Sequence, residues 1–199
     1  MRTALILTAL LALAGCDRAV ETAKQQVDNA VEQGTRAAID EMKAQASAVI
    51  ADSGLDASAV AAQVKEHGEK LKEGAKKLVG DDWSRLDAMV GQYPRDIGLY
   101  TEVSPIMPEL KALLGDKLDA FRGNMVTQGP LQKDGVLYVT GNKPHQGGAD
   151  AAYLLIDSKA RRLEVGLVER GKLTVYASPG EPLAKPKDVR TFVSNVGSV

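Results

Sequence analysis

The stretch TGNKPHQGG, residues 140–148, contains the side chain best suited to chemistry with another molecule. Its histidine, His145, is one of two in the chain and follows Lys143 and Pro144. Proline fixes its own φ, and the glycines of the stretch permit a sharply turned loop with little side-chain bulk. We expect His145 to stand on the crest of a protruding loop, with Lys143 beside it. An imidazole in that position suits insertion into the cleft of a partner.

Catalysis by the chain itself is not indicated. The sequence contains no Gly-x-Ser-x-Gly elbow, no Walker loop and no paired histidines at metal-ligand spacing. Asp150 is the only ligand-type residue within a few positions of His145, which is too few for a metal site. We therefore predict that the protein is not an enzyme and uses no cofactor or metal. The plain alternative for His145 is an exposed loop residue without a role.

The loop should be positioned by a domain over residues 81–199, where all eight prolines and every aromatic residue of the chain occur. Period-two stretches separated by turn signals predict five strands, at NMVTQGPL, GVLYVTG, AAYLLID, RRLEVGLVE and KLTVYAS. Because the links are short, the strands should form an antiparallel meander, with the His145 loop between the second and the third. The predicted fold class is α+β: a five-stranded antiparallel meander sheet with flanking helices, gathered on one face.

Three helices are expected beside this sheet. Ser104-Pro105 looks like an N-cap followed by proline at the first helical position, which would open a helix that continues to Phe121. KPKDVRTFVSNV predicts a short C-terminal helix, and DDWSRLDAMVGQY predicts another, with one face formed by Trp83, Leu86, Met89 and Val90. In the last two strands, alternation predicts that Glu164 points away from the core. The residues predicted to face the core are Leu163, Val165, Leu167, Leu173 and Val175.

The charge of this domain argues against one class of partner. Residues 81–199 contain equal numbers of acidic and basic side chains. Nucleic-acid-binding domains usually carry a basic excess on one face. We therefore predict no nucleic-acid partner.

The N-terminus predicts export and a lipid anchor. A short basic start is followed by the apolar run ALILTALLALAG, which is too short to span a bilayer comfortably and is typical of an export signal. Leu13-Ala14-Gly15-Cys16 resembles a bacterial lipobox, in which the cysteine is lipidated and becomes the first residue of the mature protein. We predict a signal peptide over residues 1–15 and a palmitate-bearing lipoprotein of the bacterial cell envelope, facing the periplasm. Asp17 resembles an inner-membrane retention signal; the alternative is an ordinary signal peptide with a chance cysteine.

Residues 16–80 are predicted to be the lipid anchor followed by an Ala-rich helical spacer. No proline or aromatic residue occurs between 17 and 80, and apolar residues recur in steps of three, four and seven. Ser53-Gly54, followed by Asp56 or Ser58, predicts the end of one helix and the start of another. Two helices or one broken rod are expected, which could self-associate as a loose coiled coil. The alternative is a partly disordered tether, since small side chains bury little area.

The sequence YVTGNKPHQGGADAAYLLID, with the later strand RLEVGLVE, resembles the central part of the inhibitor of vertebrate lysozyme (Ivy) family. In that family a loop reading Cys-Lys-Pro-His-Asp-Cys lies between two strands of an antiparallel sheet, and its histidine enters the active-site cleft of C-type lysozyme. Lys143, Pro144 and His145 match this loop, and the resemblance extends over about residues 83–176. It implies a binding module that inhibits a muramidase, either a lysozyme or a lytic transglycosylase, and that can form a homodimer.

The sequence departs from the family at three loop positions. Asn142 and Gly147 stand where the family has its two loop cysteines, and Gln146 stands where it has an acidic residue. Without the disulfide, more of the cost of ordering the loop would fall on binding. Side-chain hydrogen bonds of Asn142 could stabilise the turn. The predicted partner-binding loop is residues 142–147, and the alternative function is an envelope spacer that binds a partner through the helices.

Overall fold

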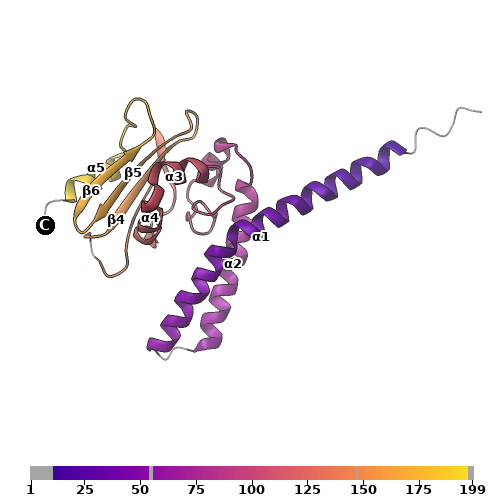
Figure 1. Ribbon diagram of the computed structural model, residues 1–199, viewed down its shortest axis with the longest axis horizontal. Coiled ribbons are helices and arrows are strands. Elements are labelled where there is room, and N and C mark those ends of the chain that lie inside the picture. Colours follow the sequence, from indigo (N-terminus) through magenta and orange to yellow (C-terminus); the bar gives the residue numbers. More distant parts are fainter. Residues whose placement is uncertain (1–10, 54–55, 147, 197–199) are drawn as a thin grey trace, which may run out of the picture.

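The computed structural model describes residues 11–53, 56–146 and 148–196 (Figure 1). Two long helices, α1 (Leu11–Ser53) and α2 (Ala57–Leu78), form an antiparallel hairpin. The Asp56 carboxylate caps α2 by accepting a hydrogen bond from the backbone N of Ser58, as predicted. The part of α1 before Asp28 runs past the end of α2 and stands clear of the rest of the molecule (Figure 1). Within the described ranges, neither helix has the combined length and apolar character that a membrane crossing needs.

The hairpin packs on the C-terminal domain. Leu71, Ala75 and Leu78 of α2 are buried. Gly74 lies so close to the domain that a Cβ there would overlap the carbonyl oxygen of Asp96. On α1, a Cβ on Gly34 would lie 2.5 Å from Cγ1 of Val103. Glycines therefore allow both helices to approach the domain closely, and the hairpin is fastened to it.

Five short helices belong to the domain: η1 (Trp83–Met89), α3 (Met107–Leu114), η2 (Gly115–Lys117), α4 (Leu118–Asn124) and α5 (Lys187–Asn195). The predicted continuous helix from Ser104 to Phe121 is wrong. It begins only at Met107, and Gly115 interrupts it with a φ of 54°, which a right-handed helix cannot contain. The helix η1 is of the 3₁₀ type. Val90, which was predicted on its buried face, is 43% exposed because η1 ends at Met89.

The sheet confirms the α+β class and the antiparallel meander. Its strands are β1 (Thr127–Gln128), β2 (Gln132–Asp134), β3 (Val136–Asn142), β4 (Ala151–Asp157), β5 (Arg162–Glu169) and β6 (Lys172–Ala177). The order is β1-β3-β4-β5-β6, with β2 also paired to β3. Only β1 falls within the first predicted strand, residues 124–131; β2 follows it, where no strand was predicted, and both pair with the same edge of β3. Gly129 and Pro130 separate them, since proline lacks the N–H that a continuous ladder needs.

Helices lie on both faces of the sheet, not on one as predicted. On the first face, the short helices contribute Trp83, Leu110 and Phe121 to a core with Leu163, Val165 and Leu167 of β5. On the second face, α5 and the segment before it cover Tyr138, Tyr153 and Leu155 with Leu183 and Val189.

The register of β6 overturns the prediction for Leu173 and Val175. Val165 pairs with Tyr176 and Gly166 pairs with Val175, so Leu173 and Val175 lie on the second face, where Val175 is 48% exposed. Glu164 faces away from the first core as predicted, but it is buried on the second face. There its carboxylate accepts a hydrogen bond from the Tyr153 hydroxyl and pairs with Nζ of Lys185, each at 2.7 Å.

Candidate functional site

The His145 loop connects β3 to β4 and consists of two successive turns. Its base is closed by the backbone N of Lys143, which donates to the carbonyl of Asp150 at 2.9 Å. In the first turn, the N of Gln146 donates to the carbonyl of Lys143 at 3.3 Å, with Pro144 and His145 at the centre. His145 has a φ of 61°. Proline at the second position and positive φ at the third are the features of a type II turn.

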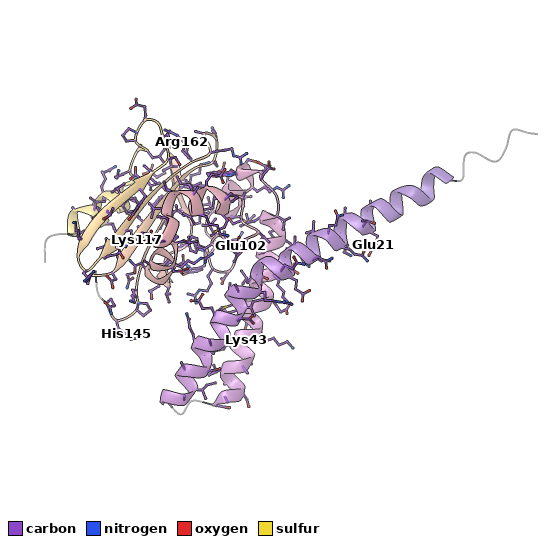
Figure 2. All side chains as sticks on the ribbon, in the orientation of Figure 1. Glu21, Lys43, Glu102, Lys117, His145 and Arg162 are labelled. Atoms are coloured by element: carbon purple, nitrogen blue, oxygen red, sulfur yellow. The ribbon has the colours of Figure 1, made fainter. Side chains whose placement is uncertain are left out.

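The imidazole of His145 is presented to solvent. The residue is exposed, and Figure 2 shows its ring at the far end of the loop, away from the body of the domain. Among the residues that the structure describes, none makes a hydrogen bond or an ion pair with this ring. Both ring nitrogens are therefore available to an external partner.

The second turn carries the chain back to the sheet. The backbone N of Ala149 donates to the carbonyl of Gln146 at 2.8 Å, and Gly148 has a φ of 84°. Gly147, a predicted member of the partner-binding loop, lies outside the described residues. The Asn142 amide donates to the Lys143 carbonyl at 3.3 Å, which is the local stabilisation expected of it.

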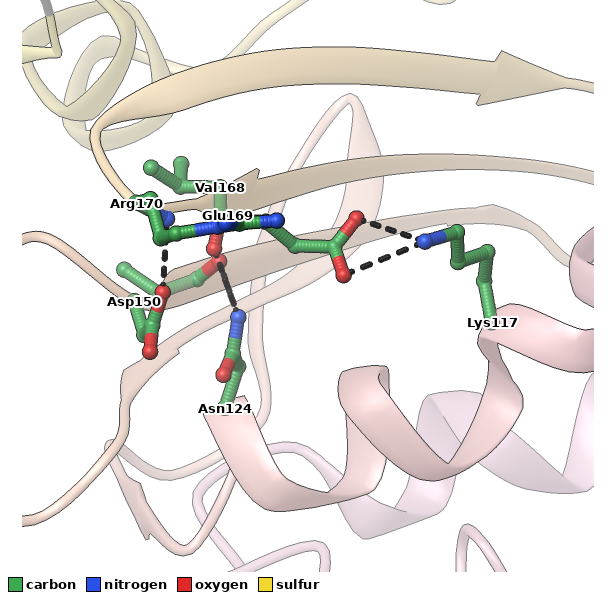
Figure 3. Close-up of polar contacts among 7 residues, drawn as sticks. Lys117, Asn124, Asp150, Val168, Glu169 and Arg170 are labelled. Carbon is green, nitrogen blue, oxygen red and sulfur yellow. Dashed lines mark hydrogen bonds and ion pairs between the residues drawn. The ribbon is translucent and has the colours of Figure 1, made fainter.

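Asp150 ties the loop to the neighbouring turn between β5 and β6. Its carboxylate accepts a hydrogen bond from the backbone N of Arg170 at 2.8 Å (Figure 3). The same carboxylate lies 3.9 Å from Nζ of Lys143. The backbone N of Gly171 also donates to the carbonyl of Ala149 at 2.7 Å. The His145 loop is therefore braced by non-covalent contacts at its base.

Two residues of the short helices hold the strand ends beneath this loop. The buried Asn124 amide donates to the carbonyls of Ala151 and Val168, at 3.0 and 2.8 Å (Figure 3). Nζ of Lys117 lies 3.0 Å from the carboxylate of Glu169, and this hydrogen-bonded partner raises the pKa of Lys117 above its ordinary value. The start of β4 and the end of β5 are thereby fixed against η2 and α4.

Several of these supporting residues were not found from the sequence. The first predicted strand contains Asn124, Asp150 stands out in the sequence only as a metal-ligand type, and Arg170-Gly171 is simply the short link between the last two predicted strands. A buried amide has no local signature, because its partners lie 27 and 44 residues away along the chain. The positively charged turn could have been noticed, since arginine is unusual beside glycine in a two-residue hairpin loop.

The remaining predicted sites lie elsewhere. Cys16 falls within α1, and its lipidation stays a prediction. His67, on α2, is exposed, with Nδ1 2.9 Å from the carbonyl of Gln63. Within the described residues, no three histidine, cysteine, aspartate or glutamate side chains are grouped to hold a metal ion.

Comparison with known proteins gives one match. Residues 105–197 match the family model described as inhibitor of vertebrate lysozyme (Ivy). This region contains the sheet, α3, α4, α5 and the His145 loop, and the match confirms the predicted resemblance, although it begins later and ends later than expected. No curated protein and no solved structure matches the chain. An Ivy-type domain indicates lysozyme inhibition in general, with a lysozyme-type muramidase as the partner.

Proposed function

We propose that the protein inhibits a muramidase by inserting the His145 loop into the active-site cleft of that enzyme. The observation that carries the proposal is the exposed imidazole at the left-handed position of the turn formed by Lys143–Gln146. That position normally favours glycine or asparagine, and a histidine there costs about 1 kcal/mol of backbone strain. A strained residue on a braced loop, in a domain that matches an inhibitor family, supports a role for its side chain.

The chemistry of the target explains why an imidazole would be chosen. A retaining glycosidase holds two carboxyl groups about 5 Å apart, one protonated and one ionised. An imidazole inserted between them hydrogen-bonds to both through its two nitrogens, and its cationic form is favoured beside a carboxylate. Inhibition by this route requires occlusion of the cleft and no catalytic step. The turn is closed before binding, which lowers the ordering cost that the missing disulfide would otherwise leave.

The proposed location is the bacterial cell envelope, with the domain held in the periplasm by lipid on Cys16. The lipobox-like sequence supports the anchor, and Asp17 supports the inner membrane. Asp28 of α1 lies 3.3 Å from Nζ of Lys76 on α2, and so marks where the hairpin begins. At about 1.5 Å per residue, the helix from Cys16 to Asp28 would place the domain roughly 18 Å beyond the anchor.

A panel of muramidases tests the proposal: C-type and G-type lysozymes and bacterial lytic transglycosylases, each assayed with the full chain. His145→Asn is the informative variant, because asparagine tolerates left-handed backbone and keeps the turn while removing the imidazole. We expect it to weaken inhibition at least about tenfold, the loss of a charge-assisted hydrogen bond. His67→Asn, the same change at the other exposed histidine, should inhibit like the wild type. Undiminished inhibition by His145→Asn would refute the loop mechanism.

The panel also addresses the second candidate function, an envelope spacer acting through the helices. The observation that favours it is the part of α1 before Asp28, which stands clear of the domain and exposes Val20 at 68%. If the wild type inhibits no muramidase of the panel, the spacer becomes the better explanation.

A further inference from the structure

Three non-glycine residues in the described part of the chain have left-handed backbone: His145, Arg161 and Arg170, with φ values of 61°, 53° and 52°. Such a conformation costs an L-residue about 1–2 kcal/mol, so each instance needs a compensating contact or a role. The three residues differ in which contact, if any, offsets the strain of their backbone.

Arg161 is accounted for by contacts within the protein. Its guanidinium lies 5.6 Å from the centre of the Trp83 ring and 3.4 Å from the carboxylate of Glu109. The cation–π contact and the ion pair fasten the β4–β5 turn to the short helices. Strain at Arg161 is thus offset by packing.

No side-chain contact among the described residues offsets the backbone strain at Arg170. Arg170 and Gly171 form the two-residue turn between Glu169 and Lys172, which are paired in the β5–β6 ladder. Both turn residues have positive φ, as a type I′ turn requires, and its first position favours asparagine, aspartate or glycine. The side chain is exposed, and no described residue forms a hydrogen bond or ion pair with its guanidinium. Only its backbone N is used, in the bond to Asp150.

The position of this turn connects it with the His145 loop. The bond from Arg170 N to Asp150 (Figure 3) and the bond from Gly171 N to the Ala149 carbonyl join the two connections at one end of the sheet. Charges on this end are unequally matched: Lys143 lies near Asp150, and Glu169 pairs with Lys117, while Arg170 is unpaired among the described residues. The net result is an uncompensated cation at the same end of the sheet as the His145 loop.

We propose that Arg170 is a second contact residue for the muramidase, binding a carboxylate on the rim of the cleft that the His145 loop enters. This inference rests on the proposed function and adds a requirement on the partner: acidic residues must flank its cleft as well as line it. Arginine presents five donors in a planar fork that fits a carboxylate, which suits recognition at a rim. The bonds through Asp150 and Ala149 keep the two contact residues in one arrangement.

The test uses the full chain and a muramidase of the panel, with inhibition constants measured at low and at high salt. Arg170→Asn is expected to weaken inhibition about tenfold at low salt and less at high salt. Arg170→Glu should weaken it further. The matched control is Lys159→Glu, in the β4–β5 turn at the opposite end, where the exposed residue also uses only its backbone N, bonded to Asp157. The control should change inhibition less than about twofold.

Stability separates a contact role from a structural one. Asparagine suits the first position of a type I′ turn, so Arg170→Asn should unfold at the same temperature as the wild type or higher. A lower unfolding temperature together with weaker inhibition would assign Arg170 to structure and overturn the inference. Unchanged inhibition by Arg170→Asn, with His145→Asn still defective, would overturn the inference alone. No inhibition by the wild type would overturn the proposed function and, with it, this assignment.

Discussion

Two regions of the C-terminal domain, which we call the junction and the loop end, differ in how they use strained backbone. The junction contains Gly74, Trp83 and Arg161; here the helical hairpin meets the domain, and the β4–β5 turn contacts the short helices. The loop end contains the His145 loop and the β5–β6 turn that carries Arg170. Both regions include an arginine in left-handed backbone, but the protein holds only the first arginine side chain. Similar backbone strain therefore accompanies two different roles of the side chain. At the junction the arginine packs inside the protein, and at the loop end, under our proposal, the arginine contacts an external partner.

The same contrast appears in how each region is assembled. At the junction, glycines let backbones approach one another closely, and apolar side chains such as Leu78 and Trp83 pack in the core there. At the loop end, polar groups join separate connections: Asp150 accepts from Arg170, and Asn124 donates to two strand ends. Close packing resists displacement, whereas a polar frame fixes the geometry of a loop while its outer side chains stay free.

The largest effect should come from filling the space at Gly74. Gly74→Ala would drive a Cβ into the backbone around Asp96, so we expect a loss of about 3 kcal/mol in unfolding free energy, measured by urea denaturation. Gly68→Ala is the control on the same helix, since its Cβ would lie 4.0 Å from Ile39 Cγ1 and fit. The control should gain roughly 0.5–1 kcal/mol from helix propensity. Equal stability of the two variants would mean that α2 does not rest on the domain.

A smaller loss is expected at the loop end from Asn124→Ala. The carbonyls of Ala151 and Val168 would lose a buried donor, at a cost of about 2 kcal/mol in unfolding free energy. Inhibition should weaken as well, because the strand ends beneath the His145 loop are released. Asn142→Ala removes only one weaker bond of 3.3 Å and should cost about 0.5 kcal/mol. If Asn124→Ala unfolds like the wild type, the polar frame does not hold this end.

Sequence patterns predicted the loop end better than its supports. Alternation located β3 to β6, and the glycines around Pro144 predicted a turned loop, because both signals are local. Alternation cannot say which face of a strand meets which helix, and here both faces are covered, so β6 was assigned to the wrong side. The Gly115 interruption was missed because apolar spacing continues across it. Asn124 could not be found, since its role exists only when distant strand ends meet.

The smallest expected difference is between the same substitution, arginine to asparagine, at Arg170 and at Arg161. Arg170→Asn should raise the unfolding free energy by about 0.5–1 kcal/mol, because asparagine relieves the left-handed strain and no internal side-chain contact is lost. Arg161→Asn gains the same relief but loses the Trp83 and Glu109 contacts, worth about 1 kcal/mol together, so its stability should be unchanged or lower. Thermal and urea unfolding of both variants would measure the difference. Equal gains would show that the Trp83 and Glu109 contacts contribute nothing, and the distinction between the two regions would then rest on binding alone.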